Sequence, residues 1–78
     1  MPSPFWLVRP RSDGGSDYVS FLPAPGGSGA HLVEIREGSH LPPQMPLLKR
    51  RQWLPSEEAE LQCRRLQQGG YRHSEPLF

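Results

Sequence analysis

Residues 55–70 read PSEEAELQCRRLQQGG and carry the clearest structural signal in the chain. Pro55 suits the first position of a helix, and two glutamates follow in the first turn, where the helix dipole is positive. Two arginines near the other end and a glycine pair after it are typical of a helix C-terminus. The pattern predicts a helix over 55–68. Its buried stripe, at i, i+4 and i+7, would consist of Ala59, Cys63 and Leu66.

Three segments upstream of this helix predict β-strands. Phe5–Arg9 is aromatic and β-branched, whereas Asp17–Leu22 and His31–Glu37 alternate apolar and polar residues. Asp13 and Gly14 form a good hairpin turn between the first two, because glycine accepts positive φ at no steric cost. We therefore expect an α+β fold: a small three-stranded antiparallel sheet followed by one C-terminal helix.

The remaining segments divide the chain without adding a second domain. We expect one domain over 1–78, with a β-rich part (5–37), a Pro-rich and basic connector (38–54), the helix (55–68) and a tail (72–78). Breaker residues at 23–29 predict a further flexible connector inside the β-rich part. In the proline-containing connector, the apolar side chains are expected to tuck against the sheet: Leu41, Met45, Leu47 and Leu48.

Composition limits the function classes. Ten prolines and eight glycines make up about 23% of 78 residues, near the roughly 25–30% of low-complexity chains, so the core must be small. A net charge of +1 argues against non-specific nucleic-acid binding. The single Cys63 excludes an internal disulfide and favours a reducing compartment, and no apolar run approaches the roughly 20 residues of a membrane span. We expect a soluble, cytoplasmic protein that has no contact with membranes.

Short motifs spread over most of the chain resemble a known family. The sequence has LLKRRQWL at 47–54, SEEA at 56–59, then Leu66 and Gly70-Tyr71, and it begins with FWL at 5–7. These motifs resemble short uncharacterised proteins of marine picocyanobacteria that carry a domain of unknown function. That pattern has an aromatic residue at the position of Cys63 and Trp at the position of Tyr71, which implies a smaller core in this chain. The resemblance implies no activity, cofactor or partner.

Catalytic and metal-binding patterns were sought among the cysteine and the three histidines. Cys63 lies in the middle of the predicted helix, away from the N-terminal end that would lower its pKa, and is better interpreted as a structural thiol. His31, His40 and His73 lack the short spacing that preforms a zinc site. Glycine-rich phosphate loops and paired carboxylates are also missing from the sequence. We therefore predict no enzyme activity, no catalytic residues, no cofactor and no metal.

Two binding surfaces remain as candidates. One helix covers only one sheet face, so the other face, with Trp6, Tyr18 and Leu22, is a candidate interface for a homodimer or another protein. The alternative is that the Pro-rich segment wraps over this face and closes it.

The second candidate is a nucleic-acid surface in which basic residues neutralise phosphates and a tryptophan stacks on a base. Its residues would be Lys49, Arg50, Arg51, Trp53, Arg64 and Arg65. The structural alternative has Trp53 packing at the start of the helix while the charges are merely solvated. The sequence leads us to expect a small protein-interaction module, with nucleic-acid binding as the alternative.

Overall fold

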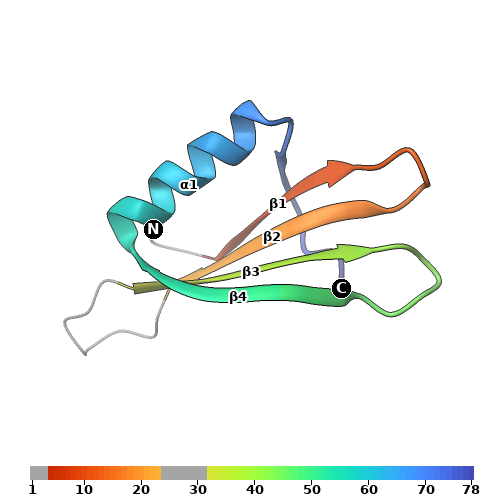
Figure 1. Ribbon diagram of the computed structural model, residues 1–78, viewed down its shortest axis with the longest axis horizontal. Coiled ribbons are helices and arrows are strands. Elements are labelled where there is room, and N and C mark those ends of the chain that lie inside the picture. The colour runs from red at the N-terminus through yellow and green to blue at the C-terminus, as the bar shows by residue number, and fades with distance from the viewer. Residues whose placement is uncertain (1–3, 24–31) are drawn as a thin grey trace.

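The computed structural model describes residues 4–23 and 32–78. Five strands and one helix follow along the chain: β1 (Phe5–Pro10), β2 (Ser16–Pro23), β3 (Leu32–His40), β4 (Leu47–Pro55), α1 (Ser56–Gln68) and β5 (Arg72–Ser74). The strands form one sheet in the order β4-β3-β2-β1-β5. Each neighbouring pair is antiparallel, and the helix lies along one side of the sheet (Figure 1).

The expected three-stranded sheet is wrong, because two further strands join it. β4 takes up the end of the segment interpreted as a connector (38–54) together with Pro55, the predicted first residue of the helix, and β5 lies within the predicted tail (72–78). The end of β3 also runs to His40, three residues beyond the predicted strand. β4 escaped notice because its helix-facing positions Arg50 and Gln52 are polar, so its sequence lacks the alternation of a half-buried strand.

The helix ends as the glycine pair predicts. Pro55 is extended (φ −56°, ψ 151°) and precedes the first helical residue, Ser56. At the other end Gly70 adopts φ +99°, and the amide of Tyr71 donates to the carbonyl of Leu66 at 3.0 Å. The chain therefore reverses at Gly70, which carries it back beside β1 as β5.

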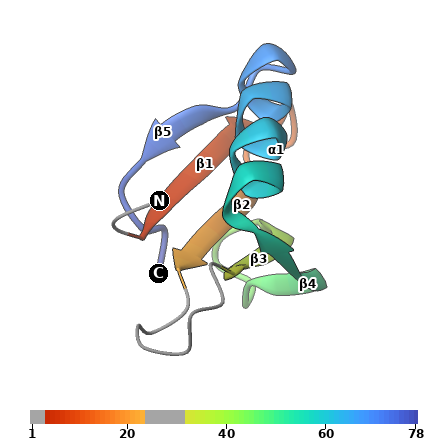
Figure 2. The ribbon, with the colours of Figure 1, turned by 90° about the vertical axis from the view of Figure 1, so that its left-hand side faces the viewer.

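The hydrophobic core lies between the helix and one face of the sheet. Its fully buried members come from β1, β2, β3 and α1: Leu7, Val19, Phe21, Val33, Ile35 and Ala59. Cys63 and Leu66, the other members of the predicted helix stripe, are partly buried against it. Phe5 stacks on Phe21 with ring centroids 4.8 Å apart. The view along the helix side shows α1 standing against one side of the sheet only (Figure 2).

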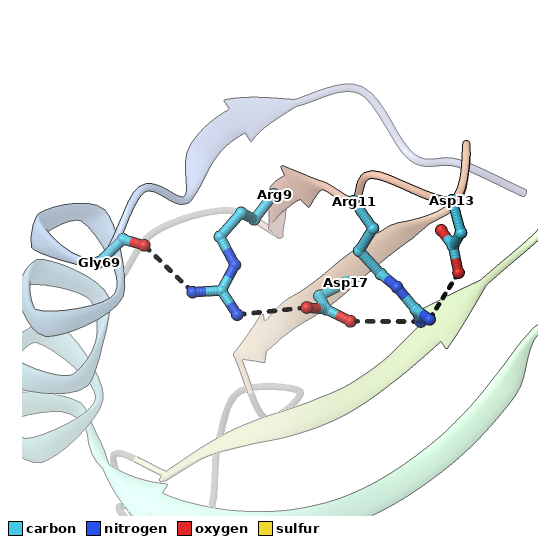
Figure 3. Close-up of polar contacts among 5 residues, drawn as sticks. All are labelled: Arg9, Arg11, Asp13, Asp17 and Gly69. Carbon is cyan, nitrogen blue, oxygen red and sulfur yellow. Dashed lines mark hydrogen bonds and ion pairs between the residues drawn. The ribbon is translucent and has the colours of Figure 1, made fainter.

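A chain of polar contacts ties the end of the helix to the first hairpin (Figure 3). The Arg9 guanidinium donates to the Gly69 carbonyl at 3.1 Å and to Asp17 at 3.2 Å, and it lies 4.6 Å from the centroid of the Tyr71 ring. Arg11 extends the chain by pairing with Asp13 at 2.7 Å and Asp17 at 3.7 Å. Arg9 therefore links β1, β2 and the helix C-terminus.

The proline-containing segment between β3 and β4 does not cover the sheet. Met45 is 86% exposed and Leu47 58% exposed, and Leu48 is also exposed, so the expectation that they tuck in is wrong. Leu41 alone of the four is half-buried. The flexible connector expected at 23–29 lies outside the described residues apart from Pro23, as does His31.

Candidate functional site

The sheet face opposite the helix, here called the open face, gathers aromatic and arginine side chains. The strand register places Trp6, Ser20, Arg36 and Arg51 in one row across β1, β2, β3 and β4. This row is one residue out of step with the core positions, and successive side chains of a strand point to opposite faces. The row therefore faces away from α1.

An aromatic cluster occupies one part of the open face. Trp6 stacks on Tyr18 with centroids 5.2 Å apart and an interplanar angle of 29°. The Phe78 ring stands edge-on to both, at 4.9 Å from Trp6 and 5.3 Å from Tyr18. Tyr18 is only 4% exposed, and burial raises its pKa despite the opposing influence of Arg36.

A carboxylate and two guanidiniums occupy the adjoining part of the face. Arg36 donates to both Glu34 oxygens, from Nε to Oε2 at 3.1 Å and from Nη2 to Oε1 at 3.2 Å. The Nε of Arg51 lies 3.0 Å from the same Oε2. Glu34 is 8% exposed, whereas both arginine side chains are well exposed. Two guanidiniums against one carboxylate leave the group with one net positive charge, and the buried Glu34 orients both of them.

A cavity of about 210 Å³ joins the two groups. Its walls include the rings of Trp6, Tyr18 and Phe78, the Ser20 side chain, and both arginines, with Pro46 and Leu48 at the β4 end. The volume is below the roughly 300–1,000 Å³ of a typical small-molecule site. Aromatic walls beside guanidiniums suit one flat ring with an attached anionic group.

Trp53 adds an exposed indole to the open face. It pairs with Glu34 across β3 and β4, and it is 52% exposed. The expectation that it packs into the core at the start of the helix is therefore wrong. Leu54, the next residue, contacts the core instead, as strand alternation requires.

The basic residues predicted to act together are divided between the two sides of β4. Arg51 lies on the open face, whereas Arg50 and Arg65 line a groove of about 400 Å³ between β4 and the helix. Lys49 is the extra residue where the β3–β4 register shifts, and it lines a third hollow with Asp17 and Glu37. Arg64 is exposed on α1 and lines none of these hollows. They do not form one continuous surface.

Sequence reasoning missed Arg36, which belongs to the open-face pair with Arg51. The alternation of β3 already placed Glu34 and Arg36 on its polar side, but the pairing with Arg51 required knowing that β4 is a strand. The three residues of the expected protein interface, Trp6, Tyr18 and Leu22, do share one face. Tyr18 is nevertheless buried under Trp6 and Phe78, so it offers little contact area while Phe78 lies there.

The candidate nucleophile lies apart from this site, whereas one candidate base, His40, borders its aromatic cluster. Cys63 is half-buried on α1, and burial raises the pKa of its thiol, with Glu60 adding to and Arg64 opposing that shift. A protonated thiol is a poor nucleophile near neutral pH. His40 packs against Phe78 and His73 against Phe5. Over residues 4–23 and 32–78, no three His, Cys, Asp or Glu side chains come together as a metal site.

Within the same part of the chain, no helix is both long and apolar enough to cross a membrane. Comparisons with protein-family models, with curated proteins and with solved structures gave no match to this chain.

Proposed function

We propose that the open face binds single-stranded nucleic acid. The observation that supports this function is the juxtaposition of Arg36 and Arg51 with three aromatic residues around one small cavity, of which Tyr18 is buried and the other two are half-buried or exposed. Arginines neutralise phosphates, and aromatic rings stack on bases of any identity. A single strand is favoured over a duplex, because in a duplex the base faces are already stacked on one another.

The Glu34 carboxylate limits the positive charge of this surface, which favours selective binding over non-specific binding. It neutralises one of two guanidiniums and holds both in place, so the surface carries two oriented guanidiniums without a large basic field. Arg51 contacts Glu34 through Nε, and its side chain is 53% exposed, so a phosphate can reach its guanidinium. Modest affinity and a shallow salt dependence follow from so few charges, because the salt slope grows with the number of phosphates neutralised.

The test compares two adjacent arginines of β4 that face opposite sides. Binding of a fluorescein-labelled 12-nucleotide oligo(dT) is followed by fluorescence anisotropy at salt concentrations between about 50 and 200 mM. Arg51→Ala should weaken binding and lower the slope of log K against log salt by about one. Arg50→Ala removes the same charge from the helix side, and it should bind nearly as the wild type does.

A second variant separates stacking from charge. Trp53→Ala should weaken oligo(dT) binding about 5- to 100-fold, which corresponds to the loss of one base stack. Leu61→Ala removes an exposed apolar side chain from α1 and is the matched control. If Arg50→Ala is as damaging as Arg51→Ala, the proposal is wrong.

Protein association through the β4 edge is a second candidate. In the described part of the chain, β4 is an outermost strand and pairs with β3 only, and exposed Leu47 and Leu48 lie on it. An unpaired apolar edge is a template for strand addition by a second copy or another protein. Light scattering over a concentration series should show a dimer that Leu47→Lys abolishes and Leu61→Lys leaves intact. A monomer at all concentrations that captures no partner would exclude this role.

A further inference from the structure

The rings of Trp6 and Tyr18 form a stacked pair whose exposed side is taken by a residue from the tail, residues 75–78. Phe78 contacts rings from three strands, since it also lies 5.5 Å from His40 on β3, in edge-to-face geometry. The chain leaves β5 and crosses the sheet on the side away from α1, ending over the strands that carry these rings (Figures 1 and 2).

The attachment of this tail is slight. In the part of the chain that the structure describes, residues 75–78 make one hydrogen bond, from the Ser74 hydroxyl to the Glu75 carbonyl, and none to the sheet beneath. The Phe78 ring is itself 59% exposed, so it covers Tyr18 while burying little of its own surface. Edge-to-face ring contacts are individually weak. A tail held this way exchanges readily with another aromatic group.

The position of Phe78 coincides with the place where a base would stack. Its ring borders the 210 Å³ cavity that also holds Ser20, Arg36 and Arg51. A nucleotide with its phosphate near the guanidiniums would bring its base toward the Trp6–Tyr18 pair. There it meets Phe78, which covers the nearly buried Tyr18. The tail and the ligand therefore compete for the same rings.

We propose that the Trp6–Tyr18 pair is a cryptic base-binding subsite capped by Phe78, and that a single-stranded nucleic acid displaces the cap. This inference rests on the proposed function of the open face. It adds a ligand class, a nucleobase, for rings that Phe78 shields when the tail lies over them. The apparent affinity for nucleic acid is then the intrinsic affinity multiplied by the fraction of molecules in which Phe78 has left the two rings.

The experiment removes the cap and measures binding of the same labelled oligo(dT). Phe78→Ala and a variant that lacks residues 75–78 should both bind several-fold more tightly than the wild type. Pro76→Ala changes an exposed tail residue and is the matched control. In a Trp53→Phe background Trp6 is the sole tryptophan, and its fluorescence should be quenched by oligo(dT), more strongly in the uncapped variants.

The outcomes separate the two proposals. Weaker or unchanged binding of both uncapped variants, with Arg51→Ala still impaired, would overturn the cap and keep the nucleic-acid function. Binding by uncapped variants alone would support both. If neither form binds, both proposals are wrong. Circular dichroism of each variant shows whether β5 and the sheet survive, and Phe78→Leu, which keeps an apolar side chain without a ring, serves if they do not.

Discussion

The two faces of the sheet contrast in composition and in what covers them. The core of the helix face consists of aliphatic and phenylalanine side chains that are at most 2% exposed to solvent. The open face holds tryptophan, arginine and a buried carboxylate, and Phe78 lies over its aromatic part. The apolar area of the helix face is buried when the chain folds, whereas the open face leaves rings and guanidiniums within reach of a ligand. The residues that stabilise the fold therefore lie on one side of the sheet, and the residues available for binding lie on the other.

The largest effect should come from breaking the helix face. Phe21→Ala removes a fully buried ring that stacks on Phe5, and it should cost about 3–5 kcal/mol of the free energy of unfolding. A domain of this size has little more than that to lose. Leu22→Ala, the adjacent residue on the open face, should cost about 1 kcal/mol, because its side chain is only half-buried. Urea denaturation measures both, and equal costs would contradict the division between faces.

A smaller loss should follow at Gly38, which lies opposite the β4 bulge. A Cβ at Gly38 would overlap the Leu47 carbonyl oxygen and lie 2.5 Å from the Tyr18 hydroxyl oxygen. Gly38→Ala should therefore cost about 1–3 kcal/mol and displace Tyr18 on the open face. At Gly69 an added Cβ would make ordinary contacts of 3.4 Å or more, so Gly69→Ala serves as the control. If the Gly38 variant keeps wild-type stability, the close packing at the bulge is wrong.

The Arg9 contacts should contribute less than either of these. Arg9→Gln loses the contact with the Tyr71 ring and the hydrogen bond to the Gly69 carbonyl, at a cost of about 1 kcal/mol. Arg11→Gln loses only exposed ion pairs with Asp13 and Asp17, and its effect should stay below about 0.5 kcal/mol. Thermal denaturation of the two variants compares them. A larger loss for Arg11 would show that the hairpin, rather than the helix end, needs the charge.

The smallest effect should be a loss of stability at alkaline pH that both faces share. Burial raises the pKa of Tyr18 on the open face and of Tyr71 on the helix face, although Arg36 and Arg9 respectively oppose the shift. Because each pKa is higher in the folded state, the stabilisation is complete below the unfolded tyrosine pKa of about 10 and is lost as pH rises through the folded values. Urea midpoints between pH 8 and 11 should fall, and they should fall less in a Tyr18→Phe/Tyr71→Phe variant. Equal slopes in the two proteins would assign the loss to other groups.

Much of the fold follows from local sequence, but β4 and β5 do not. β4 carries LLKRRQWLP, in which Leu54 is the only side chain that contacts the core from this strand. Its position at the sheet edge, beside the margin of the helix, allows polar residues at Arg50 and Gln52. β5 has three residues and forms only because the turn at Gly70 returns the chain to β1. These strands form by pairing with distant segments, and their own sequences are too short or too polar to show the alternation of apolar and polar residues that predicts a strand.

The candidate site divides in the same way. The basic cluster and Trp53 were visible in the sequence, but strand alternation along β4 places Arg50 and Arg51 on opposite faces. Arg36 enters the site through cross-strand pairing with Arg51, a contact between residues 15 positions apart. Phe78 drew no attention, because a single aromatic residue in a tail has no pattern around it.

The sequence by itself determined the elements whose signals are local. Charge and glycine placement fixed the C-terminal end of α1 and located its start to within one residue, because Pro55 precedes the helix and is not its first residue. Alternation fixed which side of β2 and β3 enters the core. Asp13 and Gly14 form the first turn, with Gly14 at φ +89°. Only the tertiary structure decided that residues 47–55 form an edge strand, that Glu34 joins two arginines, and that Phe78 lies over Trp6 and Tyr18. Local signals depend on neighbouring residues, whereas these arrangements depend on contacts that exist only after the chain has closed on itself.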